Sequence, residues 1–287
     1  NHKSFDSNGF TIGSSGSTNA NNDTYVAWQW KANGGTLTTV NVNGTTNKVD
    51  EHKRQTNTTA GFAIVTYEGV AGTNGNHPLV SHHLGKKAEL VLIKNRGQAD
   101  NWAVLHASTS ALNGLNSLIL NDTAAVSTSP DPWDGNAGTA NDVYVKGQPS
   151  AVHEVCADGE TYVAYCWTSI QGYSQFGNYV GNANADGPYV YLGFKPAWVM
   201  IKRHDSDPSW IIWDSKRPGY NGTGHRLYAD DHAAEDTGVE DSMDVLATGF
   251  KVRSTSNSSN ASGGNFLYMA FAHSPFVTST GLPCTSY

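Results

Sequence analysis

Acidic side chains are the residues of this sequence that could most directly perform chemistry, and they are concentrated in the second half of the chain. Two carboxyl groups that lie roughly 5 Å apart, or about 6.5 to 9.5 Å apart, can cleave a glycosidic bond. The available acids are Asp205, Asp207, Asp214, Asp230, Asp231 and Glu235. Their first-half counterparts are not all acidic, since His106 aligns with Asp214. A glycan-degrading site in the second half remains an alternative, but we expect no catalytic residue and no enzyme.

The sequence lacks the motifs of other enzyme classes. It has no G-x-S-x-G elbow, and GYSQFG at 172–177 has the wrong spacing for one. It has neither a P-loop nor a G-x-G-x-x-G loop to hold nucleotide phosphates. Two groups of residues, His77, His82, His83 and His106 in one half and Asp230, Asp231 and His232 in the other, match no zinc-binding spacing. We therefore expect solvated or structural histidines, with no metal site and no cofactor.

Aromatic residues in turn-rich loops are the candidates for ligand binding. Trp133 lies in PDPWDGN and Tyr220 lies in RPGYNGTGH, outside the strand-like segments. Aromatic rings can stack on sugars, and neighbouring polar side chains can bond hydroxyl groups. The predicted glycan-binding residues are Trp133, Asp131, Asp134, Tyr220, Asn221 and His225. The alternative is that each aromatic closes its own loop against the body or packs at a subunit contact.

Composition and charge exclude several classes of protein. The chain has 287 residues, enough to bury a core, and a net charge of −7 that opposes nucleic-acid binding. Even its long apolar runs are short, such as AWVMI at 197–201, whereas a membrane-spanning helix needs about 20 apolar residues. We expect no membrane insertion. Cys156 and Cys166 flank a predicted turn out of register with each other, so we expect buried thiols rather than a disulfide.

Short runs of β-branched and aromatic residues, bounded by Gly, Asn, Asp and Ser, predict an all-β chain. The predicted strands are Thr24 to Trp30, Gly61 to Tyr67, Glu89 to Lys94, Trp102 to His106, Val152 to Cys156, Tyr162 to Trp167, Tyr189 to Gly193, Trp198 to Lys202, Trp210 to Trp213, Phe250 to Arg253 and Phe266 to Ala272. Short helices are predicted only around Ala107 to Leu112 and Ala233 to Asp236.

The chain resembles itself at a nearly constant spacing, which indicates internal repeats. LGKKAELVLIKNRGQADNW, ending at Trp102, matches LGFKPAWVMIKRHDSDPSW, ending at Trp210, with an offset of 108 residues. The same offset relates Lys94 to Lys202. We therefore expect the lysine and tryptophan pairs to occupy equivalent positions in two superposable units.

A third set of similar segments suggests where the units end. TYVAWQW ends at Trp30, TYVAYCW at Trp167 and LYMAFA at Ala272. Residues 1–30 therefore resemble the end of a repeat, and we expect the natural polypeptide to extend upstream. We predict two related antiparallel β-sandwich or jelly-roll-like units in tandem. Residues 1–150 would hold the tail of a preceding repeat and the first unit, and residues 151–287 the second. The sequence leaves open whether the YVA strands join both units into one body.

Several long phrases carry a resemblance to a known family. They are LGKKAELVLIKNRGQADNWAVLHA, LILNDTAAV, YVAYCW, GYSQFGNYVGNANADGPYVYLGFKPAWVMIKR, and NASGG before FLYMAFAHSPF. In these phrases the chain resembles an uncharacterised repeat family of bacteriophage tail-fibre and related virion proteins, notably of marine phages. The resemblance covers nearly the whole chain, and the family supplies no catalytic motif.

The resemblance implies a component of the virion surface or tail that contacts a bacterial host through its surface glycan. It implies a bacterial surface polysaccharide or receptor and other virion proteins as partners, and a homo-oligomer, expected to be a trimer. Two alternatives remain: a purely structural spacer or capsid or tail decoration protein, and a glycan-degrading, tailspike-like enzyme.

Overall fold

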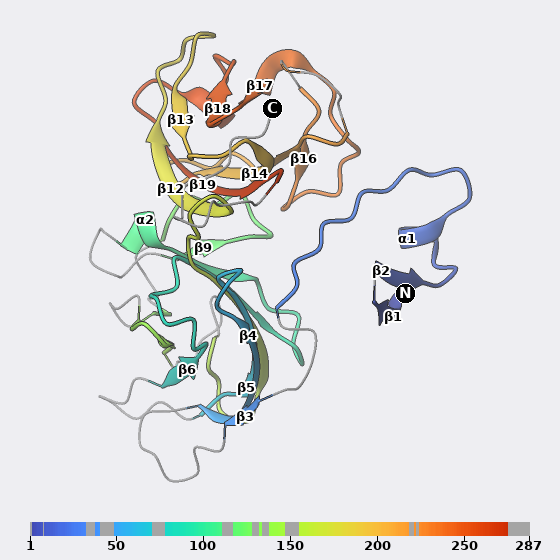
Figure 1. The fold of residues 1–287 in the computed structure, drawn as a ribbon, viewed down its shortest axis with the longest axis vertical. Helices are drawn as coiled ribbons and strands as arrows, with labels where there is room; N and C mark the ends of the chain where they lie inside the picture. Colours follow the sequence, from blue (N-terminus) through green and yellow to red (C-terminus); the bar gives the residue numbers. More distant parts are fainter. Residues whose placement is uncertain are drawn as a thin grey trace. The chain divides into compact units, whose positions relative to one another are not determined.

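The computed structural model divides the chain into two compact units, Asn1–Lys31 and Ala32–Tyr287. It describes residues 2–7, 9–32, 38–40, 49–70, 78–110, 117–127, 132–133, 138–146, 155–217, 221 and 224–274. The prediction of an all-β chain is confirmed at the level of class, since antiparallel sheets dominate and the described helices are single turns (Figure 1). No helix among the described residues is long and apolar enough to cross a membrane.

The first unit is a small hairpin followed by one helical turn. Strands β1 (His2–Asp6) and β2 (Gly9–Ile12) pair antiparallel, and α1 (Gly16–Asn19) follows. The predicted strand from Thr24 to Trp30 is wrong for this structure, in which residues 23–31 are not part of a strand. A strand is held by ladder hydrogen bonds to a neighbour, so a β-like sequence without such a neighbour forms none.

The second unit contains a seven-stranded antiparallel sheet, here the first sheet. In spatial order its strands are β3 (Thr38–Val40), β4 (Asp50–Asn57), β5 (Phe62–Glu68), β11 (Thr161–Trp167), β7 (Leu90–Asn95), β8 (Ala103–His106) and β9 (Leu118–Ile119). A two-stranded sheet of β6 (Leu79–Ser81) and β10 (Asp142–Tyr144) shares its core, which includes Val80 and Val143 together with Val65 and Tyr162.

A five-stranded sheet, here the second sheet, follows in the same unit. Its strands are β12 (Ser174–Val180), β19 (Asn265–Ala272), β14 (Pro196–Arg203), β15 (Ile211–Asp214) and β16 (Leu227–Tyr228). A three-stranded sheet of β13 (Tyr189–Tyr191), β18 (Gly249–Val252) and β17 (Met243–Leu246) shares its core through Val190 and Phe250. The short helices are α2 (Ala107–Ser110), α3 (Asn257–Asn260) and the 3-10 turn Val239–Asp241. The helix predicted at Ala233 to Asp236 does not form.

Burial patterns explain why these segments form strands. In β5 and β11 buried and partly exposed residues alternate along most of the strand, as in a sheet with one covered face. Seven of the eight residues of β19 are buried, because this interior strand is covered on both faces. Cys156 and Cys166 are free and buried, as predicted, and burial raises the pKa of these thiols to about 11 and about 12.

The two large sheets share strand order and register. The order β5-β11-β7-β8-β9 in the first sheet corresponds to β12-β19-β14-β15-β16 in the second. Leu90 lies opposite His106, and Trp198 lies opposite Asp214, at the 108-residue offset. Lys94 and Lys202 therefore occupy the same position in matching strands. Trp102 and Trp210 each come directly before the matching strands β8 and β15.

The position of β11 bears on the predicted boundary at residues 150 and 151. This strand comes after the boundary, yet it pairs with β5 on one side and β7 on the other, in the centre of the first sheet. The boundary therefore does not separate the two sheets. β11 is thus the last strand of the first sheet in the sequence but an interior strand in space. β19 likewise comes last in the second sheet and pairs on both sides.

Candidate functional site

The loop residues predicted to bind glycans lie in different environments where the structure describes them. Trp133 is 0% exposed and belongs to the first core, so its ring cannot stack on a sugar. For Trp133 the prediction is wrong, because a large apolar ring gains more from burial in the core than from exposure to water. Asp131, Asp134 and Tyr220 lie outside the described residues.

Asn221 and His225 border a network of ion pairs. Asn221 is exposed, and its Oδ1 accepts a hydrogen bond from the backbone N of Val245 at 3.0 Å. Nδ1 of His225 lies 3.3 Å from Oε1 of Glu235. Both side chains are thus engaged with the protein.

Arg217 organises the acidic residues of this network. Its Nε donates to Oδ2 of Asp214 and its Nη1 to Oε1 of Glu235, both at 2.6 Å. Burial opposes the charge of Asp214, but hydrogen bonds from the Arg217 side chain and from the backbone N of Lys216 and Arg217 outweigh it and lower its pKa. Asp214 is therefore held as a carboxylate, whereas a glycosidase needs one carboxyl group with a raised pKa as its general acid.

A second arginine fixes the neighbouring loop. Arg226 is buried, and its guanidinium donates to Tyr228 Oη and Asp236 Oδ2 at 2.6 Å and to the carbonyl of Gly238 at 3.0 Å. Every one of these partners comes from the same stretch of chain as Arg226. A buried guanidinium bonded in this way serves to hold a loop in place, because it joins three positions of the loop through hydrogen bonds to a charged group.

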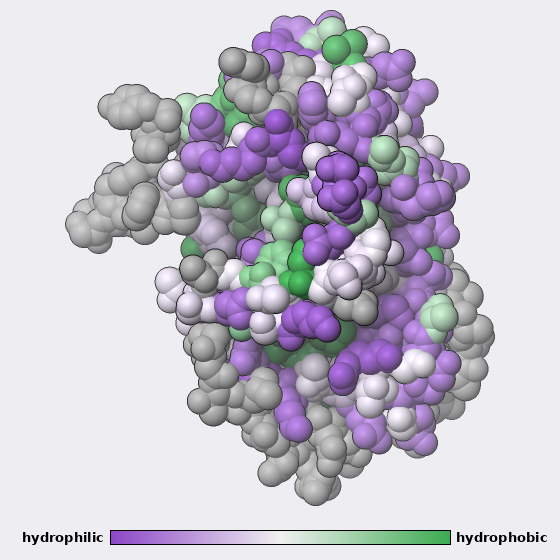
Figure 2. All heavy atoms as spheres, turned by 90° about the vertical axis from the view of Figure 1, so that its right-hand side faces the viewer, coloured by the Kyte–Doolittle hydropathy of each residue, from purple (hydrophilic) through white to green (hydrophobic). Residues whose placement is uncertain are grey.

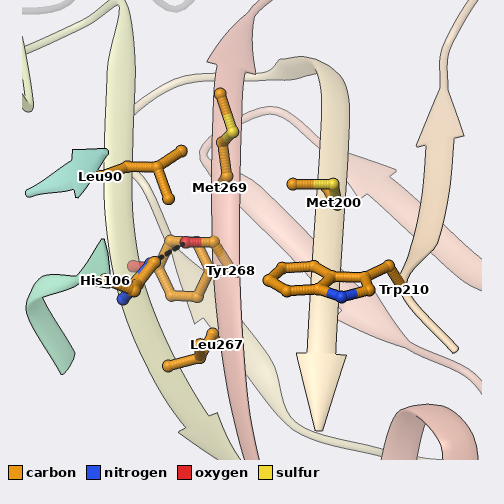
Figure 3. A pocket seen from close by; sticks show the side chains of 7 residues that line it. All are labelled: Leu90, His106, Met200, Trp210, Leu267, Tyr268 and Met269. Atoms are coloured by element: carbon orange, nitrogen blue, oxygen red, sulfur yellow. Dashed lines mark hydrogen bonds between the residues drawn. The ribbon is translucent and has the colours of Figure 1, made fainter. Parts of the chain in front are cut away.

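The contact between the two large sheets is a second place where side chains converge. Leu90 and His106 from the first sheet meet Met200, Trp210, Leu267, Tyr268 and Met269 from the second (Figure 3). His106 Nε2 lies 3.1 Å from the carbonyl of Tyr268, and Trp210 Nε1 donates to the carbonyl of Ile119 at 2.8 Å. The space between these side chains has no room for a water molecule. This junction is therefore a packing contact rather than a ligand site.

The outer face of the three-stranded sheet has the features of a binding surface. Tyr189 and Tyr191 alternate with buried Val190 along β13 and are 44% and 66% exposed. Residues directly opposite in an antiparallel pair share a face, so Lys251 and Asp244 lie in one row with Tyr189. We call this surface, formed by Tyr189, Tyr191, Lys251 and Asp244, the tyrosine face.

A chain of charged side chains borders the tyrosine face. Asp186 Oδ1 lies 3.0 Å from Lys251 Nζ and 2.9 Å from Arg253 Nη1, and Arg253 Nε donates to Asp244 Oδ2 at 2.7 Å. The hydrogen bond from Lys251 is the main cause that lowers the pKa of Asp186. Two aromatic rings beside charged donors and acceptors can take an apolar sugar face and its hydroxyl groups together.

Among the described residues, the small sheet beside the first sheet has no counterpart of the tyrosine face. At the equivalent positions of β6 stand Leu79 and Ser81, and Ser81 is buried against Asp142 with an Oγ to Oδ1 distance of 2.5 Å. The signal for this surface in the sequence is the YVY alternation at 189–191, which lies in a strand rather than in a turn-rich loop. On the face of the molecule drawn in Figure 2, hydrophilic residues predominate and apolar ones appear in patches between them.

Metal binding receives no support in the part of the chain that the structure describes, where no three His, Cys, Asp or Glu side chains are placed to hold an ion. Comparison with known proteins gave one match: a family model described as "Domain of unknown function (DUF7483)" matches residues 1–275. No curated protein and no solved structure matches the chain.

Proposed function

The chain belongs to the DUF7483 family, a domain of unknown function, and we propose that it is a non-catalytic, glycan-binding component of a bacteriophage virion surface or tail fibre. The observation that carries the binding role is the tyrosine face, where two exposed rings lie on one side of a strand held by a packed core. The phage role is supported by the resemblance of the repeated phrases, such as IKNRGQADNWAVLHA and YVGNANADGPYVYLGFKPAWVMIKR, to virion repeats.

We also propose that each large sheet and its small partner sheet form one β-sandwich repeat. The shared order and register support two related units, and each core combines apolar side chains from a large and a small sheet. A rigid sandwich keeps β13 in place because Val190 and Phe250 are buried beneath it. Exposed rings on such a strand bind at little entropic cost.

In this proposal the partners are a bacterial surface polysaccharide or receptor and other virion proteins, and the protein is a homotrimer on the virion. A single face with two rings gives weak binding. Three linked copies strengthen it, because the second and third contacts become intramolecular.

Binding of the full chain to a panel of bacterial surface polysaccharides tests the proposal. We expect at least one polysaccharide to bind. Tyr191→Ala and Tyr189→Ala should each weaken that binding by about 5- to 30-fold, because a stacked ring contributes roughly 1 to 2 kcal/mol. The melting temperature should change little for Tyr191→Ala, whose ring is the more exposed of the two.

Two control variants separate ring stacking from general apolar effects. Leu79→Ala changes the equivalent position of β6, in the small sheet beside the first sheet, and Val239→Ala changes an apolar side chain that is 76% exposed elsewhere. Both should bind as the unchanged protein does. Absence of binding to every polysaccharide would contradict the proposal and favour a structural spacer, and reducing sugar released during incubation would favour the enzyme.

A further inference from the structure

The first 30 residues repeat the local structure of a segment that elsewhere completes a large sheet. The hairpin places Asp6 opposite Gly9 and Phe5 opposite Phe10, just as β17 and β18 place Leu246 opposite Gly249 and Val245 opposite Phe250. Both hairpins lead into a short helical turn, α1 in one case and α3 in the other. We call residues 2–30 the N-terminal module.

The turn after the hairpin has two hydrogen bonds in common with its later counterpart. The carbonyl of Ser15 accepts from the backbone N of Asn19 at 2.8 Å, and that of Ser256 accepts from Asn260 at 2.8 Å. Asn19 Nδ2 donates to the carbonyl of Gly13, as Asn260 Nδ2 does to Ser254. The N-terminal module is therefore folded locally in the way its later counterpart is.

The turn that leads into the strand occurs three times. Asn22, Gly159 and Gly263 have φ angles of 69°, 72° and 69°, in the left-handed region. The carbonyls of Ala20, Ala157 and Ala261 accept from the residue three positions later in every case. This alignment makes Thr24 to Trp30 equivalent to β11 and to residues 265–271 of β19.

The two later copies of this strand are interior strands, paired on both sides. β11 lies between β5 and β7, and β19 lies between β12 and β14. Tyr162 of β11 stacks on Tyr67 with ring centroids 5.2 Å apart, and Phe266 of β19 stacks on Tyr179 at 4.9 Å. Tyr67 and Tyr179 also anchor the preceding turns, donating to the carbonyls of Val155 and Ser259.

Tyr25 is the equivalent residue in the N-terminal module, and its surroundings differ in one respect. Its hydroxyl accepts from the backbone N of Ala20 at 3.0 Å, matching the bond from Ala157 to Tyr162 at 2.9 Å. Tyr25 is nevertheless 50% exposed, whereas Tyr162 and Phe266 are fully buried. Val26 and Phe5 are exposed as well. The hydroxyl is already placed as in a completed sheet, while the ring still lacks its covering strands.

We propose that the N-terminal module is a strand donor, whose residues 24–30 insert between two antiparallel strands of an acceptor half-repeat. The acceptor is a polypeptide segment with strands that correspond to β12, β14, β15 and β16. The position of β19, between the first two of these strands, is vacant. The acceptor presents a tyrosine equivalent to Tyr67 and Tyr179 to stack on Tyr25. A second copy of this chain does not offer that place, because β11 and β19 already fill the corresponding interior positions of its two large sheets.

Hydrogen exchange on extended forms of the full chain tests this pairing. One form carries a second copy of residues 168–241 directly before Asn1, which reproduces the connection that leads into Ser242. The other carries residues 49–133 there, because β11 differs from residues 24–30 only at Tyr165 and Cys166. In the unextended chain the amides of 24–30 should exchange rapidly. In at least one extended form they should slow by about 100-fold or more.

Amides of β11 serve as the protected reference in all three proteins. Tyr25→Ser should remove the gained protection, and Val239→Ser, another exposed apolar position, should leave it intact. Equal exchange of 24–30 with and without either added segment would overturn the proposal, whether or not the added segment folds. Strong protection of 24–30 in the unextended chain would also overturn the proposal. If that chain is a monomer, the N-terminal module is self-contained. If it is a dimer, a second copy is the acceptor.

Discussion

The first and second sheets share strand order and register, but the side chains at matching positions have different surroundings. Trp102 is half-buried and stacks on Tyr165 with ring centroids 6.2 Å apart, whereas Trp210 is buried at the junction between the sheets. Lys94 is half-buried, but Lys202 is fully buried and donates to the carbonyls of Thr123 and Pro208 at 2.6 Å. A repeat thus preserves pairing and register, while the contact between the copies decides what each side chain does.

The largest expected difference concerns the two tryptophans. Trp210→Ala should lower the free energy of unfolding by about 3 to 5 kcal/mol, because it leaves a cavity at the junction and an unsatisfied Ile119 carbonyl. Trp102→Ala should cost only about 1 kcal/mol, because its ring is partly in water. Urea unfolding followed by circular dichroism measures both. Equal losses would mean that the copies are used alike.

The next largest expected difference between the two sheets is the loss of stability that their buried side chains cause in acid. Burial lowers the pKa of His106 and His82, both in the first half, to about 4 from 6.5. Between pH 6.5 and pH 4 these histidines bind protons in the unfolded chain but not in the folded chain. Stability is therefore complete above pH 6.5 and falls as the pH drops toward 4, by up to about 3 kcal/mol per histidine. Asp214, which replaces His106 in the second sheet, has a lowered pKa and loses its contribution only at lower pH.

The measurement is urea unfolding between pH 7.5 and pH 4.5, with His106→Gln as the variant. Neutral His106 accepts from the backbone N of Ser108 at Nδ1 and donates from Nε2 to Tyr268, so a glutamine loses some stability at pH 7.5. The slope of the unfolding free energy against pH should nevertheless be smaller in the variant, by the amount that corresponds to about one bound proton. An unchanged slope would show that His106 is not the group that resists protonation.

The smallest expected effects lie in the ion pairs of the second sheet. Asp214→Asn should cost about 1 to 2 kcal/mol, because Asp214 is buried and accepts from Arg217 and from two backbone N–H groups. Glu235→Gln should cost less than about 1 kcal/mol, since its side chain is 35% exposed and water screens the ion pair. Thermal unfolding at low and high salt checks this ranking. A greater loss for Glu235→Gln would show that the network is centred on the exposed acid.

Much of the strand content could be predicted from residue pattern, because alternating burial leaves a local trace in the sequence. Phe250 to Arg253 and Tyr162 to Trp167 are examples that correspond to observed strands. β4 left no such trace, since DEHKRQTN is polar throughout and pairs near the edge of its sheet through its backbone. The tyrosine face was readable as YVY, but its exposure depends on which side Val190 and Phe250 cover.

The sequence by itself determined the all-β class, the buried thiols and the 108-residue spacing that the registers preserve, since these follow from local pattern and chain identity. Only the tertiary structure decided that Trp133 is buried, that Trp210 but not Trp102 lies between the sheets, and that β11 crosses the predicted boundary to become a central strand. It also decided that TYVAWQW forms no strand at 24–30, although TYVAYCW forms one at 161–167. The physical reason is that burial and strand pairing depend on neighbours distant in sequence, which a local pattern does not specify.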